Sequence, residues 1–191
     1  MTSSDKRRPL LLLPARPASM LLVIDFQEKL VPLTADHAAV ETNIRRLLKL
    51  ASIFEMPALV TEQYVKGLGQ TTAPVREAAE GRDTMEKMEF SCFRDEAMKE
   101  RILSFSRPHA ILSGIETHVC VLQTALDLLE GGYRVYVPAD AVTSRSPENR
   151  RVGLRLMERA GASIVTTETI VFSFLERCGT PEFKAMLAEV R

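Results

Sequence analysis

The sequence predicts an α/β fold, a three-layer sandwich in which helices flank a mainly parallel, six-stranded, Rossmann-like sheet. Two observations lead to this prediction. Short apolar runs alternate with longer amphipathic stretches along the 191 residues, and such alternation gives right-handed crossovers and a parallel sheet covered on both faces. The first run, residues 20–24, is almost continuously apolar, as a central parallel strand buried on both sides would be.

Six strands are predicted from the apolar runs, of which the third is the least apolar. In chain order they are residues 20–24, 57–61, 84–88, 110–113, 134–137 and 163–166. A loop with two glycines, residues 66–70, follows the second strand. Because the strands are short and separated by longer stretches, they fit crossover connections better than hairpins.

Three helices are predicted between these strands. Residues 38–54 repeat apolar side chains at helical spacing. A second helix carries Cys120 in its first turn and ends at the glycine pair 131–132, because glycine favours helix C-termini. A third begins at the Ser-Pro pair 146–147, which offers an N-cap and a proline at the first helical position, and runs to about residue 160.

Length and composition favour one domain. We expect residues 17–191 to form it and residues 1–16 to be a loosely held arm. The basic and apolar start of the chain imitates a signal peptide, but Pro14 and Arg16 end the apolar run too early for one. The ligand cleft of such a domain is expected beyond the carboxyl ends of its strands.

Charge and cysteine usage limit the partners. The 25 basic residues balance 25 acidic ones, so no nucleic-acid footprint is expected. No apolar segment approaches the ~20 residues of a membrane span. The 3 cysteines do not form a disulfide framework, which favours free thiols and a reducing, cytoplasmic location.

Three reactive side chains are expected at one edge of the sheet. Asp25 follows the first predicted strand, Lys87 lies near the end of the third, and Cys120 follows the fourth. A thiol at a helix start is stabilised as a thiolate by the free amides and the macrodipole, so we expect a pKa below ~8.5. Asp25 would exchange the proton and the Lys87 ammonium would stabilise both anions.

Each of these residues also has a simpler interpretation. A single cysteine on an apolar helix face is usually a small core residue. An aspartate at a strand end is often a helix cap, and Lys87, between two glutamates, reads as a solvated charge. Their joint placement at strand ends is what favours a catalytic site.

Five segments carry a resemblance to the isochorismatase-like cysteine hydrolase superfamily over nearly the whole chain from about Pro14. They are VIDFQ at 23–27, EKMEFSC at 86–92, GIETHVCV at 114–121, ADAVTSR at 139–145 and TTET at 166–169. Within the superfamily, TEQY at 61–64 with GLG at 67–69 is most similar to the isochorismatase domain-containing subgroup.

The resemblance implies a catalytic triad of Asp25, Lys87 and Cys120. It also implies a cis peptide bond at 115–116 that turns the backbone N–H groups of Glu116 and Cys120 toward one oxyanion. Relatives commonly assemble as dimers or larger rings, so a homo-oligomer is expected.

Two differences between this chain and other members of the superfamily indicate the branch to which it is most similar. Isochorismatases proper do not depend on a cysteine nucleophile, whereas Cys120 keeps acyl transfer available. Nicotinamidases carry an Asp-x-His metal motif where this chain has Glu62, Gln63 and Tyr64, and the next histidine is His109. We therefore expect no metal and no cofactor, and favour hydrolysis of an amide or another C–N bond of a small molecule.

The substrate pocket is expected to be lined by six residues, any of which would serve equally well in the core. They are Phe26, Gln63, Tyr64, Phe90, Ile115 and Glu116.

Other candidates for the site are weaker. His118 should point away from Cys120, because residues i and i+2 of a helix do not share a face. Cys92 and Cys178 are interpreted as packing or incidental thiols, although either is a possible redox partner of Cys120.

Two other functions remain open. One is a scaffold protein that keeps the fold and lacks turnover, with a Cys120 of ordinary reactivity. The other is a redox sensor in which Cys120 pairs with a second thiol. Neither the substrate nor the number of subunits follows from the sequence.

Overall fold

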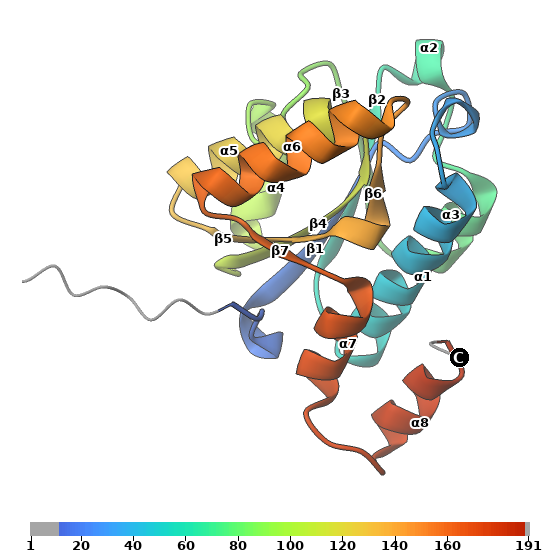
Figure 1. Cartoon of the computed structure of the whole chain (residues 1–191), viewed down its shortest axis with the longest axis vertical. Coiled ribbons are helices and arrows are strands. Elements are labelled where there is room, and N and C mark those ends of the chain that lie inside the picture. The colour runs from blue at the N-terminus through green and yellow to red at the C-terminus, as the bar shows by residue number, and fades with distance from the viewer. Residues whose placement is uncertain (1–11, 190–191) are drawn as a thin grey trace, which may run out of the picture.

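The computed structural model, which describes residues 12–189, confirms the predicted α/β sandwich (Figure 1). Seven strands form one sheet within this part of the chain, in the order β3-β2-β1-β4-β5-β7 with β6 beside β4. Every strand pair is parallel. The strands are β1 Ser19–Ile24, β2 Ala58–Gln63, β3 Asp83–Lys87, β4 His109–Ile115, β5 Arg134–Pro138, β6 Val142–Thr143 and β7 Ser163–Val165.

The sheet has one strand more than the six predicted. The additional strand, β6, spans two residues that pair with Gly114 and Ile115. A strand of two residues is too short to show a hydrophobic period in the sequence. The other six strands coincide with the predicted runs to within one or two residues at most ends.

Eight α-helices are described in residues 12–189, against three predicted. They are α1 His37–Ile53, α2 Val65–Leu68, α3 Ala73–Ala78, α4 Glu96–Ser104, α5 Leu122–Glu130, α6 Pro147–Ala160, α7 Thr167–Leu175 and α8 Pro181–Leu187. Short 3₁₀ turns occupy Arg16–Ala18 (η1), Val31–Leu33 (η2) and Ala139–Ala141 (η4), and a π-helical turn, η3, spans Thr117–Val121. The predicted loop 66–70 is partly the short helix α2.

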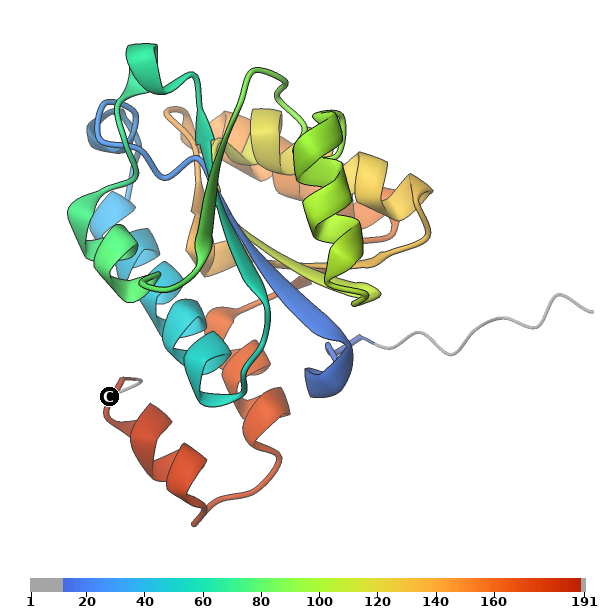
Figure 2. The same ribbon diagram turned by 180° about the vertical axis from the view of Figure 1, so that it is seen from behind.

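The helices cover both faces of the sheet. Seen from the two sides, α4, α5 and α6 lie on one face of the sheet, whereas α1 and α3 lie on the other (Figures 1 and 2). Helices α7 and α8 lie on the same side as α1 and contact it. Helix α6 begins where the sequence predicts, because the Ser146 side chain accepts a hydrogen bond from the Asn149 N–H. It ends at Gly161, whose φ of 109° suits glycine.

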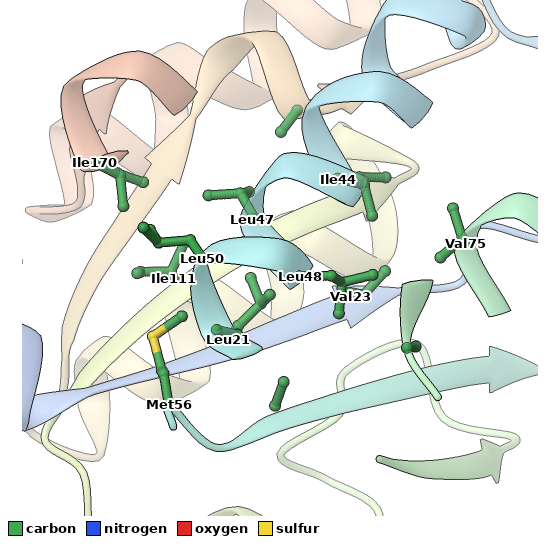
Figure 3. Packing of buried hydrophobic residues seen from close by; sticks show 14 of the residues in the cluster. Leu21, Val23, Ile44, Leu47, Leu48, Leu50, Met56, Val75, Ile111 and Ile170 are labelled. Atoms are coloured by element: carbon green, nitrogen blue, oxygen red, sulfur yellow. The ribbon is translucent and has the colours of Figure 1, made fainter. Parts of the chain in front are cut away.

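Strand β1 divides the core into two halves. Its residues are all buried, and they alternate between the sheet faces because successive strand side chains point in opposite directions. Leu21 and Val23 pack under α1 with Leu47 and its neighbours (Figure 3). Leu22 and Ile24 face α4 and α5. Burial of each such aliphatic side chain stabilises the fold by about 1.5–3 kcal/mol.

The expected N-terminal arm falls mostly outside the described residues, which begin at Leu12. The described end of this segment contacts the sheet. The Leu13 carbonyl accepts a hydrogen bond from the Tyr136 hydroxyl at 3.2 Å, and the Ala15 N–H donates to Nδ1 of His109 at 3.0 Å. No helix within residues 12–189 combines the length and apolar character needed to cross a bilayer.

Candidate active site

A buried ion pair lies at the carboxyl edge of the sheet. Asp25 directly follows β1 and Lys87 ends β3, and both are almost inaccessible to solvent, at 0% and 1% exposure. The Lys87 ammonium donates to Oδ2 of Asp25 at 2.6 Å and to Oε1 of Gln63 at 2.7 Å. Because β2 lies between β1 and β3, the lysine side chain reaches across a whole strand to meet the carboxylate.

Polar residues of β2 hold this pair in place. The Thr61 hydroxyl donates to Oδ1 of Asp25 at 2.7 Å, and the Thr61 carbonyl accepts the Asp25 N–H at 3.0 Å. Gln63 in turn is fixed by Gln27, whose Oε1 accepts the Gln63 N–H at 2.8 Å. Thr61 and Gln27 were not predicted as site residues. The available signal for Thr61 was a polar side chain after the apolar residues of a buried strand, and for Gln27 a polar side chain three residues beyond the end of one.

Cys120 lies beside the ion pair. It belongs to η3, directly before α5, and is 7% exposed. Burial raises the pKa of the Cys120 thiol, the charge of Asp25 and a hydrogen bond to Asp25 raise it further, and the Lys87 ammonium lowers it. The expected low thiol pKa is therefore wrong. Desolvation and the adjacent carboxylate outweigh the favourable position before a helix.

The ammonium of Lys87 stays charged in this setting. Burial acts to lower the pKa of Lys87, but the charges of Asp25 and the two nearby thiols, together with the Asp25 hydrogen bond, raise it above its usual value. The resting site is thus a buried thiol next to a carboxylate–ammonium pair.

The other two thiols differ in their surroundings. Cys92 is fully buried, with its Sγ 3.9 Å from Oγ1 of Thr61, and burial raises its pKa to about 11. Its N–H donates to the Thr124 hydroxyl at 3.0 Å. Cys178 is exposed, and all three cysteines are free.

The end of β4 approaches the end of β1 closely. A Cβ on Gly114 would lie 1.9 Å from the Ile24 carbonyl oxygen, so no other residue fits there without movement of the backbone. The peptide bond between Ile115 and Glu116 is cis. The Glu116 carboxylate accepts hydrogen bonds from the Arg145 backbone N–H at 2.9 Å and from its Nε at 3.1 Å.

The residues expected to line a pocket fall into three groups. Tyr64 and Phe90 expose 43% and 53% of their surface close to the end of β3. Gln63 is buried beside the ion pair, and Glu116 is buried directly before η3. Phe26 and Ile115 instead are fully buried in the core under α1, so they present no surface to a pocket at this edge.

His118 points away from the thiol, toward α6. Its Nδ1 lies 3.1 Å from the Ser144 hydroxyl and its Nε2 lies 3.2 Å from the Asn149 amide nitrogen. No group of three or more His, Cys, Asp or Glu side chains in residues 12–189 is arranged to hold a metal ion.

Comparisons with known proteins show which family this chain is similar to. The family model described as isochorismatase domain matches residues 19–169. The chain is 38% identical over 167 residues to isochorismatase domain-containing protein 2 of Danio rerio, covering 87% of this chain and 83% of that one. It is also 38% identical over 175 residues to the secreted isochorismatase effector Isc1 of Phytophthora sojae, covering 88% and 82%.

A solved structure agrees with the sequence comparisons. The MAR1 ribonuclease from Caenorhabditis elegans superposes with a TM-score of 0.87 at 37% identity, covering 93% of this chain and 92% of that one. The shared domain model, the identities over most of the chain and the common fold lead to one conclusion. The chain belongs to the isochorismatase family.

Proposed function

We propose that this protein is a cysteine-dependent hydrolase that cleaves an amide or another C–N bond of a small molecule through a thioester on Cys120. Family membership supports hydrolysis as the class of reaction. The observation that carries the finer proposal is the proximity of a nucleophile and a base: the buried Cys120 thiol lies close enough to Asp25 for this carboxylate to raise its pKa, and Oδ2 of Asp25 is ion-paired with buried Lys87.

The raised pKa of the thiol sets the order of events. Cys120 rests as a thiol, and its proton passes to Asp25 as Sγ attacks the substrate carbonyl. Lys87 remains an ammonium, so the site keeps one positive charge while negative charge moves from the carboxylate toward the tetrahedral oxygen. The backbone N–H groups of Glu116 and Cys120 are proposed to hold that oxygen.

Collapse of the tetrahedral species needs a proton on the leaving nitrogen. Asp25, now protonated, supplies it, and the C–N bond breaks to leave a thioester on Cys120. Water, deprotonated by the same carboxylate, then attacks the thioester, the C–S bond breaks to release the acid, and the proton on Asp25 returns to the Cys120 sulfur. The Thr61 hydroxyl and the Lys87 ammonium occupy separate oxygens of Asp25, which fixes the carboxylate for both proton transfers.

Substrate contacts are proposed for the exposed rim of this edge. Tyr64 and Phe90 offer flat apolar surface, and the Gln63 side chain and the backbone N–H of Glu116 offer polar atoms next to the ion pair. Phe26 and Ile115 support the site from the core. Assembly into a dimer or larger oligomer remains a prediction.

Other functions receive less support. RNA hydrolysis, which the name of the Caenorhabditis elegans relative indicates for that protein, finds no basic footprint here, because the formal net charge is 0. A scaffold without turnover would not require a fully desolvated Asp25–Lys87 pair, which is costly to bury. A redox role would require Cys120 to form a disulfide with Cys92 or Cys178, and burial raises the pKa of both Cys120 and Cys92, which disfavours the thiolates that disulfide exchange needs.

The test uses p-nitrophenyl acetate as an acylating probe and a panel of small primary and secondary amides as substrates. We expect acetyl transfer to Cys120, seen as a 42 Da mass increase on the peptide that carries it, and loss of both acylation and turnover in Cys120→Ala. Cys178→Ala is the matched control, because it removes an exposed thiol, and it should behave as the wild type. Equal activity of Cys120→Ala and wild type on every substrate, or cleavage of RNA alone, refutes the proposal.

A further inference from the structure

The end of β4 and the turn η3 that follows it are braced by residues 142–145. Gly114 and Ile115 pair with the two residues of β6. The Thr117 hydroxyl donates to the Thr143 carbonyl at 2.9 Å. His118 contacts the Ser144 hydroxyl at 3.1 Å. Four successive contacts therefore join the turn that carries Cys120 to one short stretch of chain.

The strongest contact in this brace is the one made by Glu116. Its carboxylate is 7% exposed and meets Arg145 at three donors: the backbone N–H at 2.9 Å, Nε at 3.1 Å to both oxygens, and Nη2 at 3.0 Å to Oε1. Burial acts to raise the pKa of Glu116, but the Arg145 hydrogen bonds and charge lower it below its usual value, so the group is a carboxylate at neutral pH. Forked contacts of this kind fix orientation as well as position.

The backbone of Glu116 is fixed at the same time. Its carbonyl accepts the N–H groups of Val119 and Val121, at 3.0 and 3.3 Å, which begins the turn that presents Cys120. With the carbonyl held by η3 and the side chain held by Arg145, the residue has little freedom to rotate. Its own N–H is one of the two donors assigned above to the oxyanion.

We propose that the Glu116 carboxylate and Arg145 form a clamp that positions the Glu116 N–H toward the oxyanion, so that Glu116 is a positioning residue and does not line the pocket through its side chain. This inference rests on the proposed function, because it assigns a role within acyl transfer at Cys120. The clamp acts on the stabilisation of the tetrahedral oxygen and leaves the nucleophile and base untouched.

Two reactions of the same thiol separate these roles. Alkylation of Cys120 by iodoacetamide needs the nucleophile but develops no oxyanion, whereas acylation by p-nitrophenyl acetate needs both. We would measure both rates in wild type, Glu116→Gln, Arg145→Ala and the double variant. Glutamine keeps an acceptor for the Arg145 N–H, and Arg145→Ala keeps that N–H, so each change weakens the clamp without deleting the backbone contact. Arg151→Ala is the matched control, because it breaks an exposed ion pair with Glu148 on the adjoining helix.

We expect acylation to fall about 10- to 100-fold in both single variants, since loss of a well-placed oxyanion donor costs up to ~10³-fold. Alkylation should stay within about twofold of wild type, and the double variant should be no slower in acylation than the slower single variant. The Arg151→Ala protein should match wild type in both reactions.

Three outcomes would overturn the clamp. Acylation within twofold of wild type in Glu116→Gln would show that the carboxylate positions nothing. A parallel fall of alkylation and acylation would show a general structural role. Normal alkylation of the wild type without any acylation would refute the proposed function, and the clamp with it, and this result is distinct from the other two.

Discussion

Replacement of Asp25 by asparagine tests the buried ion pair most directly. Asparagine keeps the shape and the acceptor for the Thr61 hydroxyl, but it leaves the Lys87 ammonium, 1% exposed, without its counter-charge. Removal of one partner from a buried pair costs about 3–5 kcal/mol at neutral pH. With a urea m-value of ~2 kcal/mol/M, the unfolding midpoint should fall by about 1.5–2.5 M.

The pH dependence of this loss has a definite sign. In the wild type the pKa of Lys87 is raised, so the stability it contributes is fully present below the unfolded value of 10.5 and is lost only above it. In the variant burial is no longer offset by Asp25, so the pKa of Lys87 falls. The unfolded chain then binds more protons than the folded one. Over the pH range in which Lys87 is neutral in the folded variant but charged in the unfolded chain, the free energy of unfolding of the variant therefore rises by ~1.4 kcal/mol per pH unit.

Urea titrations at pH 7 and pH 9 measure this difference. The gap in unfolding free energy between wild type and Asp25→Asn should narrow as the pH rises. Asp83→Asn is the control, because it breaks the exposed ion pair with Arg101 and should cost under about 1 kcal/mol at both pH values. A gap below about 1 kcal/mol that does not change with pH would refute a buried, charged Asp25–Lys87 pair.

Three further predictions concern the surroundings of the site. Thr61→Val removes the hydroxyl that donates to Asp25 and should lower the free energy of unfolding by about 1–3 kcal/mol in urea titrations; an unchanged midpoint would contradict the contact. Gly153→Ala places a Cβ 3.0 Å from Cα of His118, so we expect a loss of about 1–3 kcal/mol and slower acylation of Cys120, and a fully stable, active variant would argue against close packing there. Because Asp25 raises the pKa of Cys120, the alkylation rate should rise with pH through the alkaline range, and Asp25→Asn should shift this rise to lower pH; a shift to higher pH would reverse our assignment.

Much of the site was predictable because strand ends are visible in a sequence. The apolar run before Asp25 and the glycine after the fourth run mark the ends of β1 and β4, and parallel strands bring their carboxyl ends to one edge. Lys87 was harder to place, since β3 is mostly exposed and its sequence alternates poorly. Its place near the end of the third predicted strand still put it at the same edge of the sheet as Asp25 and Cys120, and the resemblance to a family then joined the three as a triad.

The predictions that failed depended on local details that the hydrophobic periodicity of a sequence does not reveal. Ile24 and Phe26 would share a face in a regular strand, yet they lie in opposite halves of the core because Asp25 adopts a φ of 51° and reverses the alternation. The sign of the Cys120 pKa shift depends on how deeply the thiol is buried and on its distance from Asp25, which the position before a helix does not reveal. The contact of Glu116 with Arg145 joins residues 29 positions apart.

Lys87 has a second consequence, for the integrity of the sheet. Strand β3 is a terminal strand of the sheet order, and Lys87 is the only buried residue among its five. The strand is held to the domain mainly by its backbone ladder with β2 and, at its carboxyl end, by the buried Lys87 side chain, which reaches across the neighbouring strand to Asp25. Local opening of an edge strand exchanges its amide hydrogens with solvent, and here the same opening would withdraw the ammonium from the carboxylate. The amide protons of β3 thus report how often the site comes apart, even when no substrate is known.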